Sequence, residues 1–176
     1  MFANPIPASK NLSLADLALI KAVEAFDLEG VQKALNEGGR VTVRKPYRGL
    51  TGEPLLLMAV RRGQAPLVQA LLNAEAPVEE GIAMAAALLV ERTTRAQEPQ
   101  ALEEAHQIVQ ALETMGIDWG VCDRSIGAGL RAIDLMAAAQ PDWAYEPARR
   151  QGLEPQRPSL PSPSGPTTGR TRRQAA

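Results

Sequence analysis

Val31-Gln32-Lys33-Ala34-Leu35 returns twice along this chain, as Val68-Gln69-Ala70-Leu71-Leu72 and as Val109-Gln110-Ala111-Leu112-Glu113. The six residues after each copy also correspond, as NEGGRV, NAEAPV and TMGIDW, and the copies start 37 and 41 residues apart. A period in this range indicates supersecondary units that stack on one another. Such stacks expose long surfaces to partners, so the recurrence favours a binding function over catalysis in a single deep pocket.

The composition favours close-packed helices. The chain has 176 residues, of which 45% are hydrophobic and only 3% aromatic. Strands prefer β-branched and aromatic residues, so we predict an all-α fold in one domain. The net charge of −1 indicates no bulk attraction to nucleic acid or to a membrane. The charge is unevenly placed, because residues 148–176 hold six arginines and one glutamate.

The sequence predicts a cytoplasmic protein. Its one cysteine, Cys122, cannot form a disulfide within the chain, which fits a reducing compartment. Residues 1–13 contain no apolar stretch of signal-peptide length. The most apolar run, residues 82–90, is far shorter than the ~20 residues that span a bilayer. We therefore predict no membrane segment.

Capping patterns and apolar spacing place the helices. Ser13 and Asp16 form a capping-box pattern at the start of the first helix. Leu17, Ile20 and Val23 then follow at helical spacing. The helices that we predict on this logic cover residues 14–25, 28–36, 54–62, 67–74, 82–92, 100–114 and 130–139.

The connections between these helices are rich in proline, glycine and polar residues. Residues 43–52 have the composition of a turn-rich segment, and residues 93–99 that of a polar linker. Pro141-Asp142-Trp143 closes the last unit without a second helix. We therefore divide the chain into a loose leader over 1–12, a helical repeat domain over 13–145 and a disordered Pro/Ser/Arg-rich tail over 146–176.

These units resemble ankyrin repeats. Residues 55–63, LLLMAVRRG, correspond to the family's first helix and following glycine, and residues 67–72, LVQALL, to its apolar second helix. The resemblance implies a short α-solenoid of about three and a half helix-turn-helix repeats. No unit has an intact Thr-Pro-Leu-His motif, so the turn that this motif stabilises must be built otherwise. The spacings exceed the family's period of about 33 residues, which places insertions near residues 44–51 and 93–99.

The resemblance also nominates a binding surface. In ankyrin-like stacks the loops between repeats and the exposed positions of the first helices meet partners. Arginine and tyrosine anchor interfaces well, so a basic surface with a tyrosine suits an acidic protein partner. The partner-binding residues that we predict are Arg44, Lys45, Tyr47, Arg48, Arg61 and Arg62, with Asp123, Arg124, Ile126 and Arg131 as a second patch. The alternative is that these charges only keep the loops soluble.

Residues that could carry catalysis form no recognisable motif. His106 and Cys122 are the only histidine and cysteine, so they cannot build a zinc cluster. We expect His106 to face solvent on a helix. The neighbouring carboxylates Glu79-Glu80 and Glu103-Glu104 fit solvated helix edges. We therefore predict no catalytic residue, no metal and no cofactor.

The function that these features predict is a non-catalytic protein–protein interaction module, monomeric in isolation. It would bind one partner through its inter-repeat loops and first helices. Two alternatives stay open: an effector or immunity-type protein that blocks an enzyme surface, and an enzyme whose site the sequence does not reveal. Specific nucleic-acid binding is not expected, because no aromatic residue interleaves Arg170, Arg172 and Arg173 in the tail.

Overall fold

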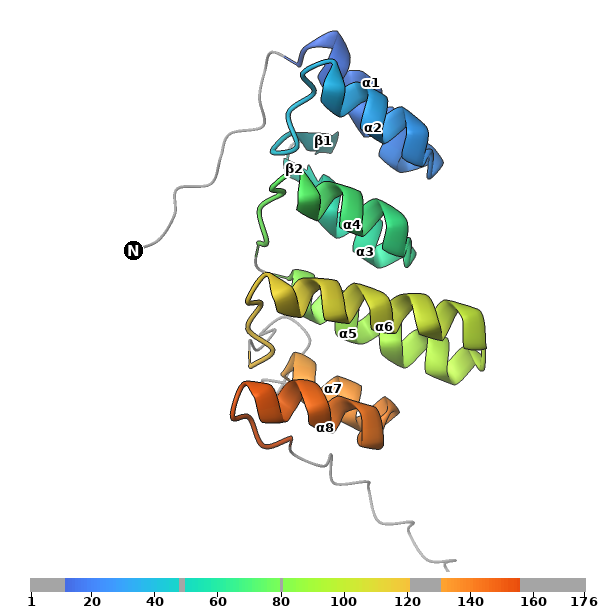
Figure 1. Ribbon diagram of the computed structural model, residues 1–176, viewed down its shortest axis with the longest axis vertical. Helices are drawn as coiled ribbons and strands as arrows, with labels where there is room; N and C mark the ends of the chain where they lie inside the picture. The colour runs from blue at the N-terminus through green and yellow to red at the C-terminus, as the bar shows by residue number, and fades with distance from the viewer. Residues whose placement is uncertain (1–11, 48–49, 80, 121–130, 156–176) are drawn as a thin grey trace, which may run out of the picture.

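The computed structural model describes residues 12–47, 50–79, 81–120 and 131–155, and within them the chain is mostly helical. Figure 1 shows helix pairs stacked in chain order along the long axis. First helices pack on first helices (α1 on α3, α3 on α5, α5 on α7), and α2 packs on α4 and α4 on α6. The elements are α1 Leu14–Ala25, α2 Leu28–Asn36, β1 Arg44–Tyr47, β2 Leu50–Pro54, α3 Leu55–Arg62, α4 Ala65–Asn73, α5 Ile82–Ala96, α6 Pro99–Thr114, α7 Ala132–Ala139 and α8 Pro141–Arg150.

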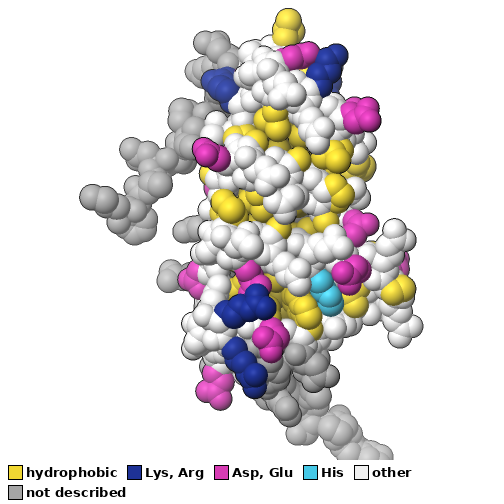
Figure 2. Space-filling model, viewed as in Figure 1, with side chains coloured by type: hydrophobic (Ala, Val, Ile, Leu, Met, Phe, Trp, Pro, Cys, Tyr) yellow, Lys and Arg dark blue, Asp and Glu magenta, His cyan; other side chains and the backbone are white. Residues whose placement is uncertain are grey.

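The recurrent Val-Gln pairs lie in the core. Val31, Val68 and Val109 are fully buried on second helices, and the glutamine after each is exposed. One short helix pair cannot cover its own apolar face, so each pair buries that face against the next. Figure 2 shows the hydrophobic side chains gathered between successive pairs on the viewed face. The recurrence therefore marks the layers of the stack.

A buried carboxylate, that of Asp16, joins the start of α1 to the segment after α2. The predicted capping box is confirmed: the Asp16 N–H donates to Ser13 Oγ at 3.0 Å, and the Ser13 N–H donates to Asp16 Oδ2 at 2.9 Å. Arg40, in the segment after α2, adds its backbone N–H at 2.9 Å and its Nη2 at 2.6 Å to the same carboxylate. The Arg40 guanidinium holds the pKa of the Asp16 carboxyl well below its usual range. We call this cluster the Asp16 clamp.

The apolar face of α1 differs in one position from the prediction. Leu17 is 41% exposed, whereas Leu19, Ile20 and Val23 are buried. The first pair is the end of the stack, so only the side of α1 that faces α2 and α3 meets another element. Leu17 keeps helical spacing with Ile20 but lies outside that contact.

The third pair is longer than its sequence suggests. The predicted linker over 93–99 is wrong, because α5 continues through Ala96 and α6 begins at Pro99. The Thr93 hydroxyl donates to the Leu89 carbonyl at 2.9 Å, so this polar residue is satisfied inside the helix. Val109 is the eleventh residue of α6, whereas Val68 is the fourth residue of α4. The seven extra residues are two helical turns, about 10 Å, and Figure 1 shows this pair projecting beyond its neighbours.

A two-stranded sheet replaces the turn-rich segment that we predicted over 43–52. β1 and β2 pair antiparallel, with Arg44 opposite Pro54 and Lys45 opposite Glu53. Pro46 and Gly52 are turn signals, but Pro46 lies in a two-stranded sheet whose strands each have a free edge, where a missing N–H is tolerated. The small sheet leads directly into α3, so a strand pair connects the first two helix pairs.

The fourth unit is a complete pair. The prediction that Pro141-Asp142-Trp143 closes the last unit without a second helix is wrong, because Pro141 starts α8, at a position where proline is favoured. Helix α8 extends to Arg150, past the predicted boundary at 145. The Gln151 side chain then accepts from the Trp119 N–H at 3.0 Å and donates to the Ile117 carbonyl at 2.6 Å. These bonds tie the end of α8 to the segment after α6.

Several predictions concern residues that the structure does not describe. The leader falls there through residue 11, as does the tail from residue 156 onward. The same holds for the segment 121–130, which contains Cys122. Among the described helices, none is long and apolar enough to cross a membrane.

We expect Asp16→Ala to lower the free energy of unfolding by about 3 kcal/mol, because it removes a helix cap and the bonds from Arg40. Ser13→Ala removes only one side of the capping box and is expected to cost about 1 kcal/mol. Urea unfolding followed by circular dichroism measures both. Equal losses in the two variants would show that Arg40 contributes nothing to the clamp.

Truncation tests the end of the domain. A chain that stops at residue 145 loses buried Ala148 and the Gln151 bonds, and we expect it to be about 2–4 kcal/mol less stable than a chain that stops at residue 155. Thermal and urea unfolding of the two chains provide the comparison. Identical midpoints would contradict a stabilising role for the second half of α8.

Candidate functional site

The structure gathers part of the predicted binding surface around β1 and the end of α3. Arg44 and Lys45 lie in β1, and Arg61 and Arg62 end α3. Tyr47 is the last residue of β1, and its side chain is not among those that the structure describes. The remaining predicted residues outside the described ranges are Arg48, Asp123, Arg124 and Ile126.

Arg44 is turned into the structure. Its side chain is only 16% exposed and forms an ion pair with Glu79, which follows α4. Its Nη1 also donates to the Gly52 carbonyl of β2 at 3.2 Å. Arg44 therefore joins the strand pair to the next helix pair, and its guanidinium is not presented to a partner.

Arg131 has a similar internal role. It precedes α7, and its guanidinium donates to Asp134 at 2.7 and 2.8 Å. It also donates to the Glu154 carbonyl at 2.7 Å. The ion pair of Arg131 and Asp134 lies at the start of the first helix of the fourth unit, just as Ser13 and Asp16 lie at the start of the first helix of the first unit. The second predicted patch thus contributes one described residue, and that residue stabilises a helix start.

Lys45, Arg61 and Arg62 border a groove between the ends of α1 and α3. The groove has a volume of about 290 Å³. We call it the α1–α3 groove; it is lined by Val23, Glu24, Phe26, Lys45, Glu53, Met58, Arg61 and Arg62. Two of its cations are already paired, Lys45 with Glu24 and Arg61 with Glu53 at 2.7 Å. The rest of its lining is the charged Arg62 and three apolar side chains, those of Val23, Phe26 and Met58.

Arg62 is placed differently from the other two cations. Its guanidinium carbon lies over the Phe26 ring, 5.5 Å from the centroid. Within the described residues Arg62 forms no ion pair, whereas Lys45 and Arg61 each do. A guanidinium over an aromatic face is held by the ring's negative quadrupole. The groove therefore presents one positive charge that no described carboxylate neutralises.

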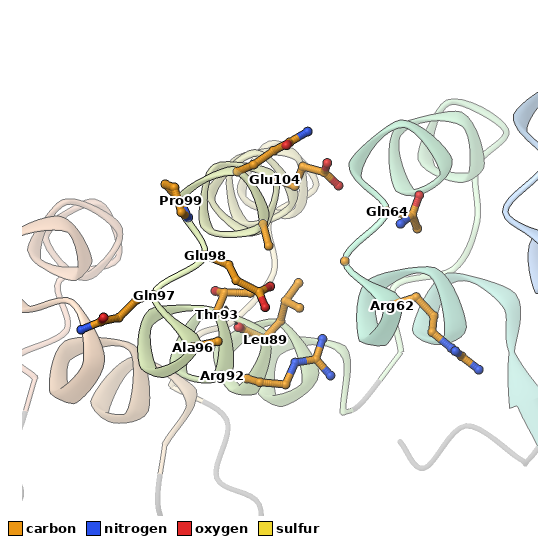
Figure 3. Close-up of a pocket in the computed structure, with 13 residues that line it drawn as sticks. Arg62, Gln64, Leu89, Arg92, Thr93, Ala96, Gln97, Glu98, Pro99 and Glu104 are labelled. Carbon is orange, nitrogen blue, oxygen red and sulfur yellow. Dashed lines mark hydrogen bonds between the residues drawn. The ribbon is translucent and has the colours of Figure 1, made fainter.

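A larger cleft lies between α3 and the projecting third pair. It has a volume of about 760 Å³, and it is open because the turn between α3 and α4 lies two helical turns short of the turn between α5 and α6. Figure 3 shows Arg92 directed across it toward the end of α3, where its Nη2 donates to the Arg61 carbonyl at 3.3 Å. Glu98 and Glu104 come from the α6 side, and Arg62 extends away from the cleft in the same view. Arg62 thus borders both hollows and directs its charge to the α1–α3 groove.

Of the described residues considered for catalysis, which are Glu79, Glu103, Glu104 and His106, only Glu104 lines either hollow. His106 is half-buried rather than fully solvent-facing as predicted, because its ring stacks on Trp143 of α8 with centroids 4.0 Å apart and planes 15° apart. Burial lowers the pKa of His106, and the nearby Glu103 carboxylate partly offsets this. In the described part of the chain, no three His, Cys, Asp or Glu side chains are grouped so as to hold a metal ion.

Sequence reasoning assigned none of the three apolar members of the groove, Val23, Phe26 and Met58, to a binding surface. Phe26 sits between the last residue of α1 and the Asp27 cap of α2. A large aromatic residue at a helix–helix turn is the signal that could have identified it, because such turns favour glycine. Met58 could not be distinguished from its core neighbours by spacing alone.

No protein-family model matches the chain, and no curated protein is similar enough to match it. The assignment of a role therefore depends on the geometry of the α1–α3 groove and of the stack that forms it.

The His106–Trp143 stack predicts a pH dependence of stability. The pKa of His106 is lower in the folded chain than in the unfolded chain, where it is near 6.5. The contribution of neutral His106 to the free energy of unfolding is therefore complete above the unfolded-state pKa. It is lost as the pH falls through the pKa of the folded chain. We expect the unfolding midpoint to decrease between about pH 7.5 and about pH 5.5, the range in which histidine titrates.

His106→Phe keeps an aromatic stack and removes the titration. Its unfolding midpoint should vary less over the same pH range than that of the unaltered chain. Thermal unfolding at each pH measures this difference. Parallel curves for the two proteins would contradict the assignment of the pH dependence to His106.

Proposed function

We propose that this protein is a short ankyrin-like α-solenoid that acts as a non-catalytic protein-binding module. Helix pairs stacked in chain order, with a strand pair leading into the second one, support this reading (Figure 1). Stacks of this kind are stabilised layer by layer, which leaves the exposed loops and first helices free to vary for recognition. The same proposal includes a cytoplasmic, monomeric protein with one protein partner.

The α1–α3 groove carries the proposal. It is built from two first helices and the strand pair, which are the elements that meet partners in the proposed architecture. Its lining combines Phe26, Met58 and arginines, and these residue types are enriched where protein interfaces bury their central contacts. A hollow of about 290 Å³ is large enough for one or two side chains of a partner and too small for a folded element. The groove therefore suits an anchoring contact within a wider interface.

Two of the residues predicted to contact a partner form ion pairs inside the structure instead. Arg44 and Arg131 stabilise the stack through Glu79 and Asp134, so their replacement would report on folding. Lys45, Arg61 and Arg62 border the groove, and of these three only Arg62 has no ion-pair partner among the described residues. Arg61 keeps much of its surface exposed beside its pairing with Glu53, and exposed pairs of this kind contribute little to stability.

We expect the double charge reversal Arg61→Glu and Arg62→Glu to weaken partner binding while the chain stays folded. The tagged protein is used to capture its partner from the native cell, and the recovered partner is then titrated against both forms. Central interface arginines contribute about 1–2 kcal/mol each or more, so the affinity should fall by at least about tenfold.

Lys33→Glu is the matched control. Lys33 is an exposed cation on α2, away from the groove, and its i,i+4 pairing with Glu37 at 3.9 Å is loose. This variant should bind the partner as the unaltered chain does. Binding that is unchanged in the double variant, or reduced equally in the control, would show that the groove is not the interface.

A further inference from the structure

Phe26 occupies a backbone conformation that suits glycine. The first three first helices all end in a left-handed residue: Phe26 with φ 59°, Gly63 with φ 73° and Gln97 with φ 55°. Glycine adopts this conformation without cost, whereas a side chain with a Cβ is strained there. A bulky aromatic residue at this position is an outlier among helix C-terminal residues. Strain of this kind is concentrated at functional sites.

Core packing does not account for the phenylalanine. Phe26 is 42% exposed, whereas Val23, one turn earlier in α1, is 2% exposed. A glycine would terminate α1 with less strain, as Gly63 terminates α3. The sequence thus keeps a large apolar ring at the surface, in a strained conformation, at the mouth of the α1–α3 groove.

Arg62 adds a positive charge next to the exposed Phe26 ring. Its guanidinium lies over the Phe26 ring and forms no ion pair with any described residue. When the ring covers one face of a guanidinium, the N–H groups along its edge remain able to donate, and this edge matches a carboxylate. The other two cations of the groove, Lys45 and Arg61, are paired with Glu24 and Glu53. The positive charge left to a ligand is therefore that of Arg62.

We propose that Phe26 and Arg62 form the anchor for a partner-protein segment that presents a carboxylate next to a large apolar side chain. The carboxylate accepts hydrogen bonds from the edge of the Arg62 guanidinium. The apolar side chain enters the groove and packs on the Phe26 ring and on Met58. This assignment rests on the proposed protein-binding function and specifies the chemistry of the partner. A basic segment is disfavoured, because the two groove carboxylates already have cations.

A selection from displayed random peptides tests the chemistry directly. The full chain is immobilised, and the enriched peptides are sequenced and synthesised for titration. The expected peptides carry Asp or Glu within one or two positions of a large apolar residue. Their affinity should fall by at least about tenfold on Phe26→Gly and on Arg62→Gln, since buried interface anchors have effects of this size.

Gln97→Gly is the matched control. It makes the same change of a left-handed residue to glycine, at the end of α5 and outside the α1–α3 groove. The peptides should bind this variant as they bind the unaltered chain. Thermal unfolding provides the second readout: both glycine variants should unfold at the same temperature as the unaltered chain or higher. A Phe26→Gly chain that unfolds at a clearly lower temperature would assign Phe26 a structural role and overturn the proposal.

The remaining outcomes separate this inference from the proposed function. Peptides that lack a carboxylate, or that keep their affinity for the Phe26→Gly and Arg62→Gln chains, overturn the inference. If peptides of either kind still compete with the captured partner for binding, the proposed protein-binding function is retained and only the Phe26–Arg62 anchor is rejected. Enrichment no greater than on an unrelated helical protein contradicts both. A single-stranded oligonucleotide that binds the groove more tightly than the peptides would also overturn the inference, because it assigns the arginine to phosphate.

Discussion

The whole structure depends on one constraint: a pair of short helices cannot bury its own apolar face. Each pair therefore has to lie against the next, and the fully buried Val31, Val68 and Val109 mark the successive layers. Polar interactions then fix the ends of the stack. The Asp16 clamp closes the first pair, and Gln151 ties the last helix to the segment after α6. Exposed side chains outside these contacts, such as Phe26 and Arg62, are free of this task, and our proposal assigns recognition to them.

The placement of the proposed anchor residues follows from the same geometry. First helices end side by side because they pack on one another, so the left-handed turn after α1 lies near the end of α3. That neighbourhood brings Phe26 beneath Arg62, two residues that are far apart in the sequence. Both residues line the α1–α3 groove, although neither belongs to the repeated Val-Gln pattern. What distinguishes the copies thus determines the surface, while what they share determines the layers.

The sequence predicted the existence of the helices well, because capping and apolar spacing are local signals. Ser13 and Asp16 identified the start of α1, and glycine identified the end of α3. It failed where local signals were ambiguous: proline at 141 suggested a stop although it begins α8, and the polar residues after Arg92 suggested a linker although they continue α5. Of the residues predicted to contact a partner, Lys45, Arg61 and Arg62 line the groove, whereas Arg44 is turned inward. The sequence could not predict the pairing of Arg44 with Glu79, because these residues are 35 positions apart and their contact leaves no signal in residue spacing.

The projecting tips of α5 and α6 have a consequence for how the chain tolerates change. Beyond the ends of α3 and α4 these tips are supported mainly by each other (Figure 1). Segments with few packed neighbours open locally at a lower free-energy cost than the core, and their amides exchange with solvent sooner. Opening there leaves the layers below intact. Whole turns can therefore be added to or removed from this pair in the course of evolution, while the register of the remaining stack is preserved.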